Sequence, residues 1–218
     1  MPPPSPSNPP LAPIEALVAD PKAEGSVQVM IDGRRLFSVP LSAVLAENLR
    51  PGQVLAAEAY ARLSVAADQD AAYRTAVRLL GRRPFARRDL GRRLVQRGHP
   101  LGAVKAALER AASVGYLDDA EFARHYVQTR LVRGRGPDRL KRELGIMGID
   151  RSLADAAIEA GFGDPAVAET AIERLVVRRL PAIKGDSAWI RRQKLLAYLA
   201  RRGYRGEVAR AVVERLVR

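Results

Sequence analysis

The chain has 218 residues and a formal net charge of +13, and it contains no cysteine. Without cysteine, disulfides, thiolate zinc sites and cysteine nucleophiles are excluded. Residues 1–10 lack the basic start and apolar core of a secretory signal, and charged residues interrupt every long apolar stretch. We therefore expect a soluble, cytoplasmic protein that does not insert into a membrane.

The first 66 residues combine a proline-rich beginning with one clear strand signal. Residues 1–25 are rich in proline and small side chains, which predicts a disordered leader. From residue 27 apolar residues alternate with other residues, and Asp32-Gly33 is a typical hairpin-turn dipeptide, so a β-hairpin is predicted at 27–40. A short helix at 41–49 follows. Residues 26–66 thus form a small module that we expect to lean on later helices.

From about residue 57 the chain has a helical pattern. A long helix is predicted to end near Gly81, and helices at 86–97 and 101–114 follow. Asp118 is predicted to cap the next helix, with Glu121 three residues later. Pro137 and Pro165 stand at the favoured first position of further helices, and Ser187 is predicted to cap another after a loop at 184–186.

Three segments repeat the phrase Leu-x-x-x-Leu-x-x-x-Gly. It occurs at 90–98, 140–148 and 195–203, and each glycine is followed ten residues later by another apolar side chain. Two leucines four residues apart lie on one helical face, and the glycine is the usual end of such a helix. We therefore predict a mainly α protein with three tandem three-helix bundles at 67–117, 118–163 and 164–218, stacked into an elongated, curved array.

The positive charge lies entirely in these repeats. Residues 1–66 hold 5 Lys/Arg and 6 Asp/Glu, whereas residues 67–218 hold 32 and 18. Arginine predominates, and its planar guanidinium suits phosphate and carboxylate. On the first repeated helix, Arg88 and Arg92 lie opposite the two leucines and are expected to face solvent or a partner. A polyanion partner, most often nucleic acid, is indicated, bound through its backbone without sequence readout.

Enzyme chemistry has little support in the sequence. His99 follows a repeat glycine and is interpreted as a packing or surface residue, and His125 has no second histidine at metal-ligand spacing. Asp118, Asp119 and Glu121 could hold Mg²⁺ in principle, but helix capping explains them without a metal. The Gly134-x-Gly136 stretch lacks the residues of a phosphate-binding loop and is interpreted as a flexible interhelical turn. No cofactor, metal or catalytic residue is predicted.

One long segment resembles a known family. Gly115-Tyr-Leu-Asp-Asp-Ala-Glu-Phe-Ala, an arginine eight residues after Phe122, and Glu143-Leu144-x-x-x-Gly148-Ile149 resemble the pattern of the RecX regulatory family. Asp89-Leu90-x-x-x-Leu94 and Arg202-Gly203-Tyr204 are similar to its first and last repeats, although Ala86 stands where many members have a capping serine. The resemblance covers about residue 70 to the C-terminus.

The resemblance implies a non-enzymatic, monomeric modulator that binds the RecA–single-stranded DNA filament in its helical groove, inhibits its ATPase and strand-exchange activities and promotes disassembly. Double-stranded DNA is a possible further partner. The alternative function is a basic helical DNA-binding or transcription-regulating protein that does not depend on RecA. The candidate DNA- or RecA-binding residues are Arg88, Arg92, Arg93, Arg130, Arg133, Arg135, Arg139, Lys141, Arg142, Arg191, Arg192, Lys194, Arg201 and Arg202.

Overall fold

A computed structural model describes residues 11–184 and 187–217 of the chain. These residues form two compact units. Unit 1 comprises residues 11–83 and 91–116, and unit 2 comprises residues 84–90 and 117–217. The proline-rich residues 1–10 and most of the loop predicted at 184–186 lie outside the described ranges.

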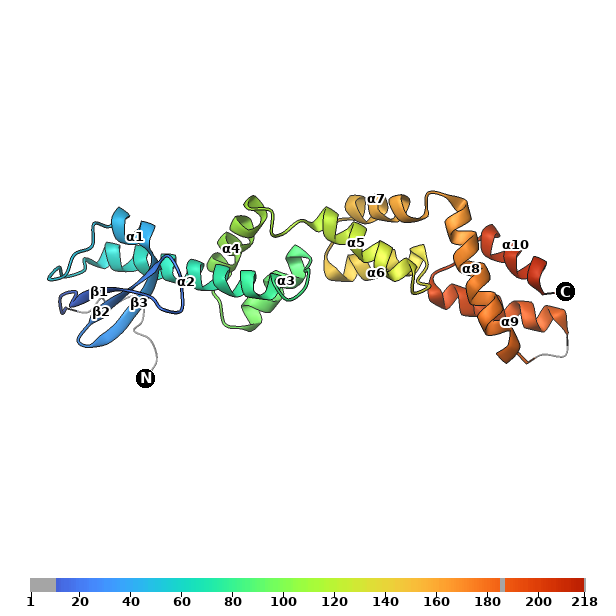
Figure 1. Cartoon of the computed structure of the whole chain (residues 1–218), viewed down its shortest axis with the longest axis horizontal. Helices are drawn as coiled ribbons and strands as arrows, with labels where there is room; N and C mark the ends of the chain where they lie inside the picture. Colours follow the sequence, from blue (N-terminus) through green and yellow to red (C-terminus); the bar gives the residue numbers. More distant parts are fainter. Residues whose placement is uncertain (1–10, 185–186, 218) are drawn as a thin grey trace. The chain divides into compact units, whose positions relative to one another are not determined.

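Unit 1 begins with a three-stranded antiparallel sheet in the order β1-β2-β3 (Figure 1). The strands are β1 (Ala16–Ala19), β2 (Ser26–Ile31) and β3 (Arg34–Pro40). Asp32 and Gly33 both have positive φ in the turn between β2 and β3, which confirms the predicted hairpin. The strand β1 was not predicted. Since β1 pairs with β2, the expectation of a disordered leader is wrong for residues 16–19.

The sheet and α1 (Leu41–Ala46) pack on the first half of α2 (Ala57–Leu80). Their shared core contains Ile14, Val29 and Val39 of the sheet region with Tyr60 and Leu63 of α2. The second half of α2 packs on α4 (Leu101–Ser113) through a small alanine cluster. The long helix α2 therefore packs against both the sheet and the first repeat. The prediction that the N-terminal module leans on later helices is confirmed.

A buried carboxylate ties the sheet to these helices. The Asp70 carboxylate of α2 accepts a hydrogen bond from Ser26 Oγ of β2 at 3.2 Å and pairs with Arg74 at 2.6 Å. Arg110 of α4 lies 3.8 Å from the same carboxylate and 3.9 Å above the ring of Tyr73. Three elements thus meet at one acidic side chain.

A second carboxylate in unit 1 has a depressed pKa. Hydrogen bonds to Asp20 from the Ser38 hydroxyl and then the Lys22 amide hold its pKa at about 2. A depressed pKa stabilises the fold above the ordinary pKa near 4, and this contribution is lost as the pH falls towards 2.

We expect Ser38→Ala to move the pKa of Asp20 up towards its ordinary value, because the hydroxyl donor is lost. An NMR titration of the Asp20 carboxyl carbon measures this shift. The exposed Ser42 provides the control, since Ser42→Ala should leave the titration unchanged. An Asp20 pKa that stays at about 2 in Ser38→Ala would show that the hydroxyl does not set it.

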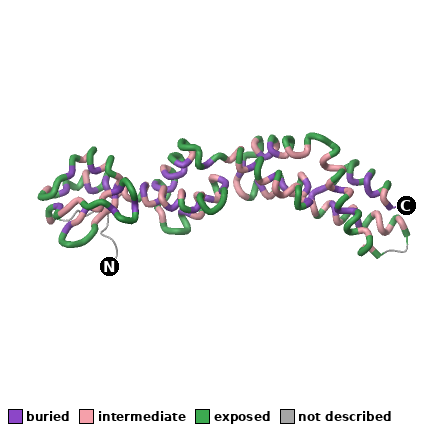
Figure 2. Tube along the Cα trace, viewed as in Figure 1, coloured by how far each residue is buried: buried purple, intermediate pink, exposed green. Residues whose placement is uncertain are grey.

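Unit 2 contains the second and third repeats. The second repeat consists of α5 (Asp119–Leu131), α6 (Pro137–Met147) and α7 (Arg151–Phe162). The third consists of α8 (Pro165–Arg179), a 3₁₀ turn η1 (Leu180–Ala182), α9 (Ala188–Arg202) and α10 (Glu207–Leu216). Each repeat has its own core, and Figure 2 shows buried positions alternating with exposed ones along these helices. The predicted helical architecture is confirmed.

The repeated leucines and glycines behave as predicted. Leu140, Leu144, Leu195 and Leu199 are fully buried. The first repeated helix is α3 (Arg87–Gln96), whose Leu90 and Leu94 are also buried. The glycines that follow these helices, Gly98, Gly148 and Gly203, have φ of +86°, +86° and +92°. Each glycine therefore ends its helix in the left-handed conformation.

The repeat glycines of unit 2 also join one repeat to the next. A Cβ added at Gly203 would come within 2.5 Å of the backbone nitrogen of Arg139, and one added at Gly136 would strike Gly203. The carbonyl oxygens of Arg202 and Gly203 accept hydrogen bonds from the amides of Gly136 and Asp138 at 2.8 and 3.2 Å. The C-terminal end of α9 thus meets the N-terminal end of α6, an arrangement that satisfies orphan groups at both ends.

The start of α3 is held by a neighbouring repeat. Asp119 Oδ1 accepts a hydrogen bond from the Arg87 amide at 2.7 Å, so this carboxylate takes the place of the missing capping serine at Ala86. Asp118 accepts from the amides of Ala120 and Glu121 at 2.8 and 2.9 Å. The interpretation of the acidic cluster as capping residues is confirmed for Asp118 and Asp119, and Glu121 lies in the first turn of α5.

Candidate nucleic-acid interface

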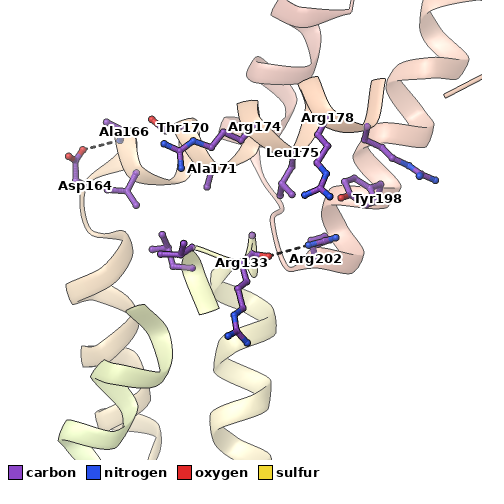
Figure 3. Close-up of a pocket in the computed structure, with 15 residues that line it drawn as sticks. Arg133, Asp164, Ala166, Thr170, Ala171, Arg174, Leu175, Arg178, Tyr198 and Arg202 are labelled. Carbon is purple, nitrogen blue, oxygen red and sulfur yellow. Dashed lines mark hydrogen bonds between the residues drawn. The ribbon is translucent and has the colours of Figure 1, made fainter. Parts of the chain in front are cut away.

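A groove of about 810 Å³ in unit 2 is lined by several arginines (Figure 3). It lies between the C-terminal end of α5 and the helices α8 and α9. Five arginines line it, together with Tyr198, Thr170 and apolar side chains; the arginines are Arg133, Arg174, Arg178, Arg179 and Arg202. We call this the arginine groove.

The helix α8 separates its charges between two faces. Thr170, Arg174 and Arg178 follow one another at four-residue intervals, so they share the face that lines the groove. The acidic residues of α8 are engaged elsewhere: Arg215 of α10 pairs with Glu169 at 2.8 Å and also with Glu173. The groove therefore receives the basic face of α8.

The acidic residue at the groove does not neutralise it. Among the described residues that line it, Asp164 alone is acidic, and its Oδ1 accepts from the amide of Ala166 at 2.9 Å at the start of α8. Figure 3 shows Asp164 at the opposite end of the groove from Arg178 and Arg202. A strongly positive potential is thus expected near Arg178.

A second hollow of about 400 Å³ adjoins the arginine groove. It shares Arg179 and Tyr198 with the groove and adds Lys184, Lys194 and Arg201. None of the described residues that line it is acidic. The Lys194 ammonium donates a hydrogen bond to the carbonyl oxygen of Lys184 at 2.7 Å, which holds it at this edge. We call this the lysine hollow.

Four of the predicted candidates, Arg133, Lys194, Arg201 and Arg202, line these two hollows. Arg202 donates to the carbonyl oxygen of Arg133 at 3.3 Å. In Figure 3 the Arg133 guanidinium points away from Arg178, so this residue contributes to the groove through its backbone.

Several other candidates make internal contacts. The Glu143 carboxylate pairs with Arg135 at 2.6 Å and with Arg139 at 2.9 Å, and it accepts a hydrogen bond from the Tyr126 hydroxyl at 2.9 Å. Burial alone would raise the pKa of Glu143, but these donors lower it below its ordinary value. The network uses both arginines within the second repeat, so their guanidiniums are less available to a partner than the sequence indicated.

The remaining candidates have varied surroundings. Lys141 pairs with Asp155 at 2.5 Å, and Arg192 donates to the Val217 carbonyl at 2.9 Å. Arg88 is exposed, but a Cβ at Gly148 would strike its aliphatic stem, so Arg88 packs on the second repeat. Arg130 lies over the ring of Tyr126, and Arg142 donates to a carbonyl of its own helix. Arg92 is exposed, and Arg93 and Arg191 are half-buried.

Sequence reasoning missed Arg174, Arg178 and Arg179. These arginines lie on the first helix of their repeat, outside the repeated phrase that directed the search. The four-residue spacing of Thr170, Arg174 and Arg178 was visible in the sequence and could have found them. Gly134 lies in the turn between α5 and α6 with φ of +73°, as the interpretation of an interhelical turn requires, and a Cβ there would also lie 2.9 Å from the Leu175 side chain of α8.

The histidines agree with their interpretation. The Nε2 atom of His99 lies 3.1 Å from the Thr75 hydroxyl, and burial lowers its pKa. His125 is exposed. No group of three potential metal ligands occurs among the described residues. Within those ranges, no helix combines the length and hydropathy needed to cross a bilayer.

Comparison with known proteins identifies the family. Family models of the second and third three-helix domains of RecX match residues 118–158 and 168–213. The regulatory protein RecX of Xanthomonas axonopodis pv. citri is 37% identical over 136 residues, which are 62% of this chain and 82% of that protein. The chain belongs to the RecX family.

Other RecX proteins agree with this placement. The regulatory protein RecX of Halorhodospira halophila is 35% identical over 137 residues, which are 62% of this chain and 82% of that protein. A crystal structure of a regulatory protein RecX has a TM-score of 0.79 at 23% identity, covering 94% of this chain and all of the other. The crystal structure of RecX from Lactobacillus salivarius has a TM-score of 0.63 at 17% identity, and the match covers 68% of this chain and 96% of the other. These two structures show that the fold is shared.

Proposed function

We propose that this protein is a cytoplasmic, monomeric inhibitor of the RecA–single-stranded DNA filament. On this proposal it binds in the filament groove, suppresses ATP hydrolysis and strand exchange, and promotes disassembly without catalysing a reaction or using a cofactor. Membership of the RecX family, whose relatives are named regulatory proteins, supports this function. The observation that carries it is the arginine groove, which arginines of α8 and α9 line and in which Asp164, a helix cap, is the one acidic residue among the described lining residues.

The chemistry of the groove suits a component of such a filament. Guanidiniums bind phosphate through paired hydrogen bonds, and a filament presents both DNA phosphates and acidic protein side chains. The groove is open to solvent along exposed arginines of α8, so a polymeric ligand can reach it. A regulator that competes for such sites needs affinity rather than turnover, which agrees with the absence of a predicted catalytic group.

We expect the purified protein to inhibit RecA-dependent ATP hydrolysis on single-stranded DNA at stoichiometric or lower ratios to RecA. The double variant Arg174→Glu/Arg178→Glu should inhibit at least tenfold less effectively, because two cations become anions in the groove. Arg210→Glu is the control, since Arg210 is exposed on α10 and lines neither hollow. Absence of inhibition by the wild-type protein would overturn the proposed function.

A second candidate function is DNA binding without RecA, and the excess of arginine in the groove favours it as an alternative. The two functions differ in one measurement. A plain DNA-binding protein would slow ATP hydrolysis only in proportion to the DNA that it occupies, so excess single-stranded DNA would restore full RecA activity. An inhibitor of the filament itself would slow ATP hydrolysis at ratios to RecA that are too low to cover the DNA.

A further inference from the structure

Tyr198 lines both the arginine groove and the lysine hollow, and its ring contacts two arginines. The guanidinium carbon of Arg202 lies 5.3 Å from the centroid of the Tyr198 ring, and that of Arg179 lies 5.6 Å from it. Both distances are within the range of a cation–π interaction. One aromatic ring therefore contacts two cations.

The ring attracts both guanidiniums but carries no net charge, so it does not neutralise them. Arg179 is exposed, and no acidic partner is found for either arginine among the described residues. Arg202 uses one donor on the Arg133 carbonyl, and a guanidinium has five. The two arginines thus keep positive charge and hydrogen-bond donors available for an anion.

Further cations extend from this pair in two directions. Arg178 points from α8 towards Tyr198 and Arg202 in Figure 3, and Arg174 lies one turn earlier on α8. Lys194 and Arg201 line the lysine hollow that shares Arg179 with the groove. A row of cations through two adjoining hollows matches a ligand with regularly spaced negative charges.

The size and chemistry of the hollows favour a single nucleic-acid strand over other polyanions. Hollows of about 810 and 400 Å³ have the volumes of small-molecule sites, so a single chain can enter them while a duplex would meet only their rims. Because both arginines already occupy the Tyr198 ring, the ring is not a platform for a base. Binding would therefore use phosphates and be insensitive to sequence.

We propose that the arginine groove and the lysine hollow form one path for the phosphate backbone of single-stranded nucleic acid, in which Tyr198 positions Arg179 and Arg202 as a phosphate clamp. This inference rests on the proposed function, since it assigns the DNA component of the filament to this surface. Tyr198 is a positioning residue, and the two arginines make the contact.

The test is fluorescence anisotropy of labelled oligo-dT with the full chain and without RecA, over a range of salt concentrations. Arg179→Ala, Arg178→Ala and Arg174→Ala should each weaken binding about tenfold and reduce the magnitude of the salt slope by about 0.7. Arg210→Ala is the matched control and should leave affinity and slope unchanged. A wild-type level of binding in the three groove variants would overturn the proposed path.

Two substitutions of Tyr198 test whether its aromatic ring positions the arginines. Tyr198→Phe keeps the ring and should bind within about twofold of wild type, whereas Tyr198→Leu should bind about fivefold more weakly. Arg179→Ala should cost less in the Tyr198→Leu background than alone, because the ring no longer holds the guanidinium. Independent, additive effects in a folded double variant would overturn the positioning role, and thermal unfolding checks that the variants are folded.

Two comparisons separate the possible outcomes. A poly-glutamate peptide that displaces oligo-dT from the groove at equal charge concentration would overturn the assignment to nucleic acid in favour of acidic protein. Groove-dependent DNA binding without inhibition of RecA would uphold the path and overturn the proposed function. RecA inhibition by a protein whose groove variants bind DNA normally would uphold that function and overturn the path.

Discussion

Replacing Gly203 with alanine is expected to destabilise unit 2 by about 2–5 kcal/mol. The φ of +92° alone costs an L-residue about 1–2 kcal/mol. The added Cβ would also lie within 2.5 Å of the Arg139 backbone nitrogen and 3.0 Å from the Gly136 carbonyl oxygen. Because backbone atoms at a helix start cannot move aside without breaking hydrogen bonds, this overlap adds about 1–3 kcal/mol.

The chain provides its own control for this prediction. Gly98 ends α3 with φ of +86°, and a Cβ there would meet nothing within 4 Å. Gly98→Ala should therefore cost only the conformational term of about 1–2 kcal/mol. Hydrogen exchange measured by mass spectrometry reports each unit separately, and Gly98 lies in unit 1 while Gly203 lies in unit 2. Equal losses of stability in Gly98→Ala and Gly203→Ala would contradict the close backbone contact between α9 and α6.

The second large effect is expected at Asp70. Asp70→Ala would remove the carboxylate that Ser26, Arg74 and Arg110 share, and we expect unit 1 to lose about 2–3 kcal/mol of stability. This is below the loss for a fully buried pair, because a third of the Arg74 side chain is exposed. Ser26 and Arg74 would remain without their acceptor at the contact between sheet and helix.

Chemical denaturation followed by far-UV circular dichroism measures this loss. Asp68 is the matched control, because it is an exposed aspartate on the same helix. Asp68→Ala should change stability by less than about 0.5 kcal/mol. If Asp70→Ala is as stable as Asp68→Ala, the buried carboxylate does not hold the sheet to α2 and α4.

Local signals in the sequence were enough to predict most of the helices. Leucines four residues apart, Pro137 and Pro165 at first positions, and Ser187 as a cap all act within one or two turns of the chain. The strand β1 could not be predicted in this way. Ala16 and Ala19 carry little strand preference, and the strand forms because it pairs with β2 and places Ile14 in the core.

The candidate site was only partly predictable for a related reason. Counting charges located the basic region, but whether an arginine is available depends on which acid the fold brings to it. Glu143 pairs with Arg135 and Arg139. Arg215 pairs with Glu169 and Glu173, so these two carboxylates of α8 are engaged at α10 and not at Arg174 and Arg178. The Arg139–Glu143 pair is four residues apart and was visible in the sequence, whereas the contact across α8 and α10 depends on tertiary packing.

The joint between α9 and α6 is made by main-chain groups, and this affects how freely the sequence can diverge. Carbonyls of Arg202 and Gly203 meet amides of Gly136 and Asp138, so the joint requires glycine at 136 and 203 and little else. Surface charge can therefore change in this chain without altering the main-chain groups that make the joint.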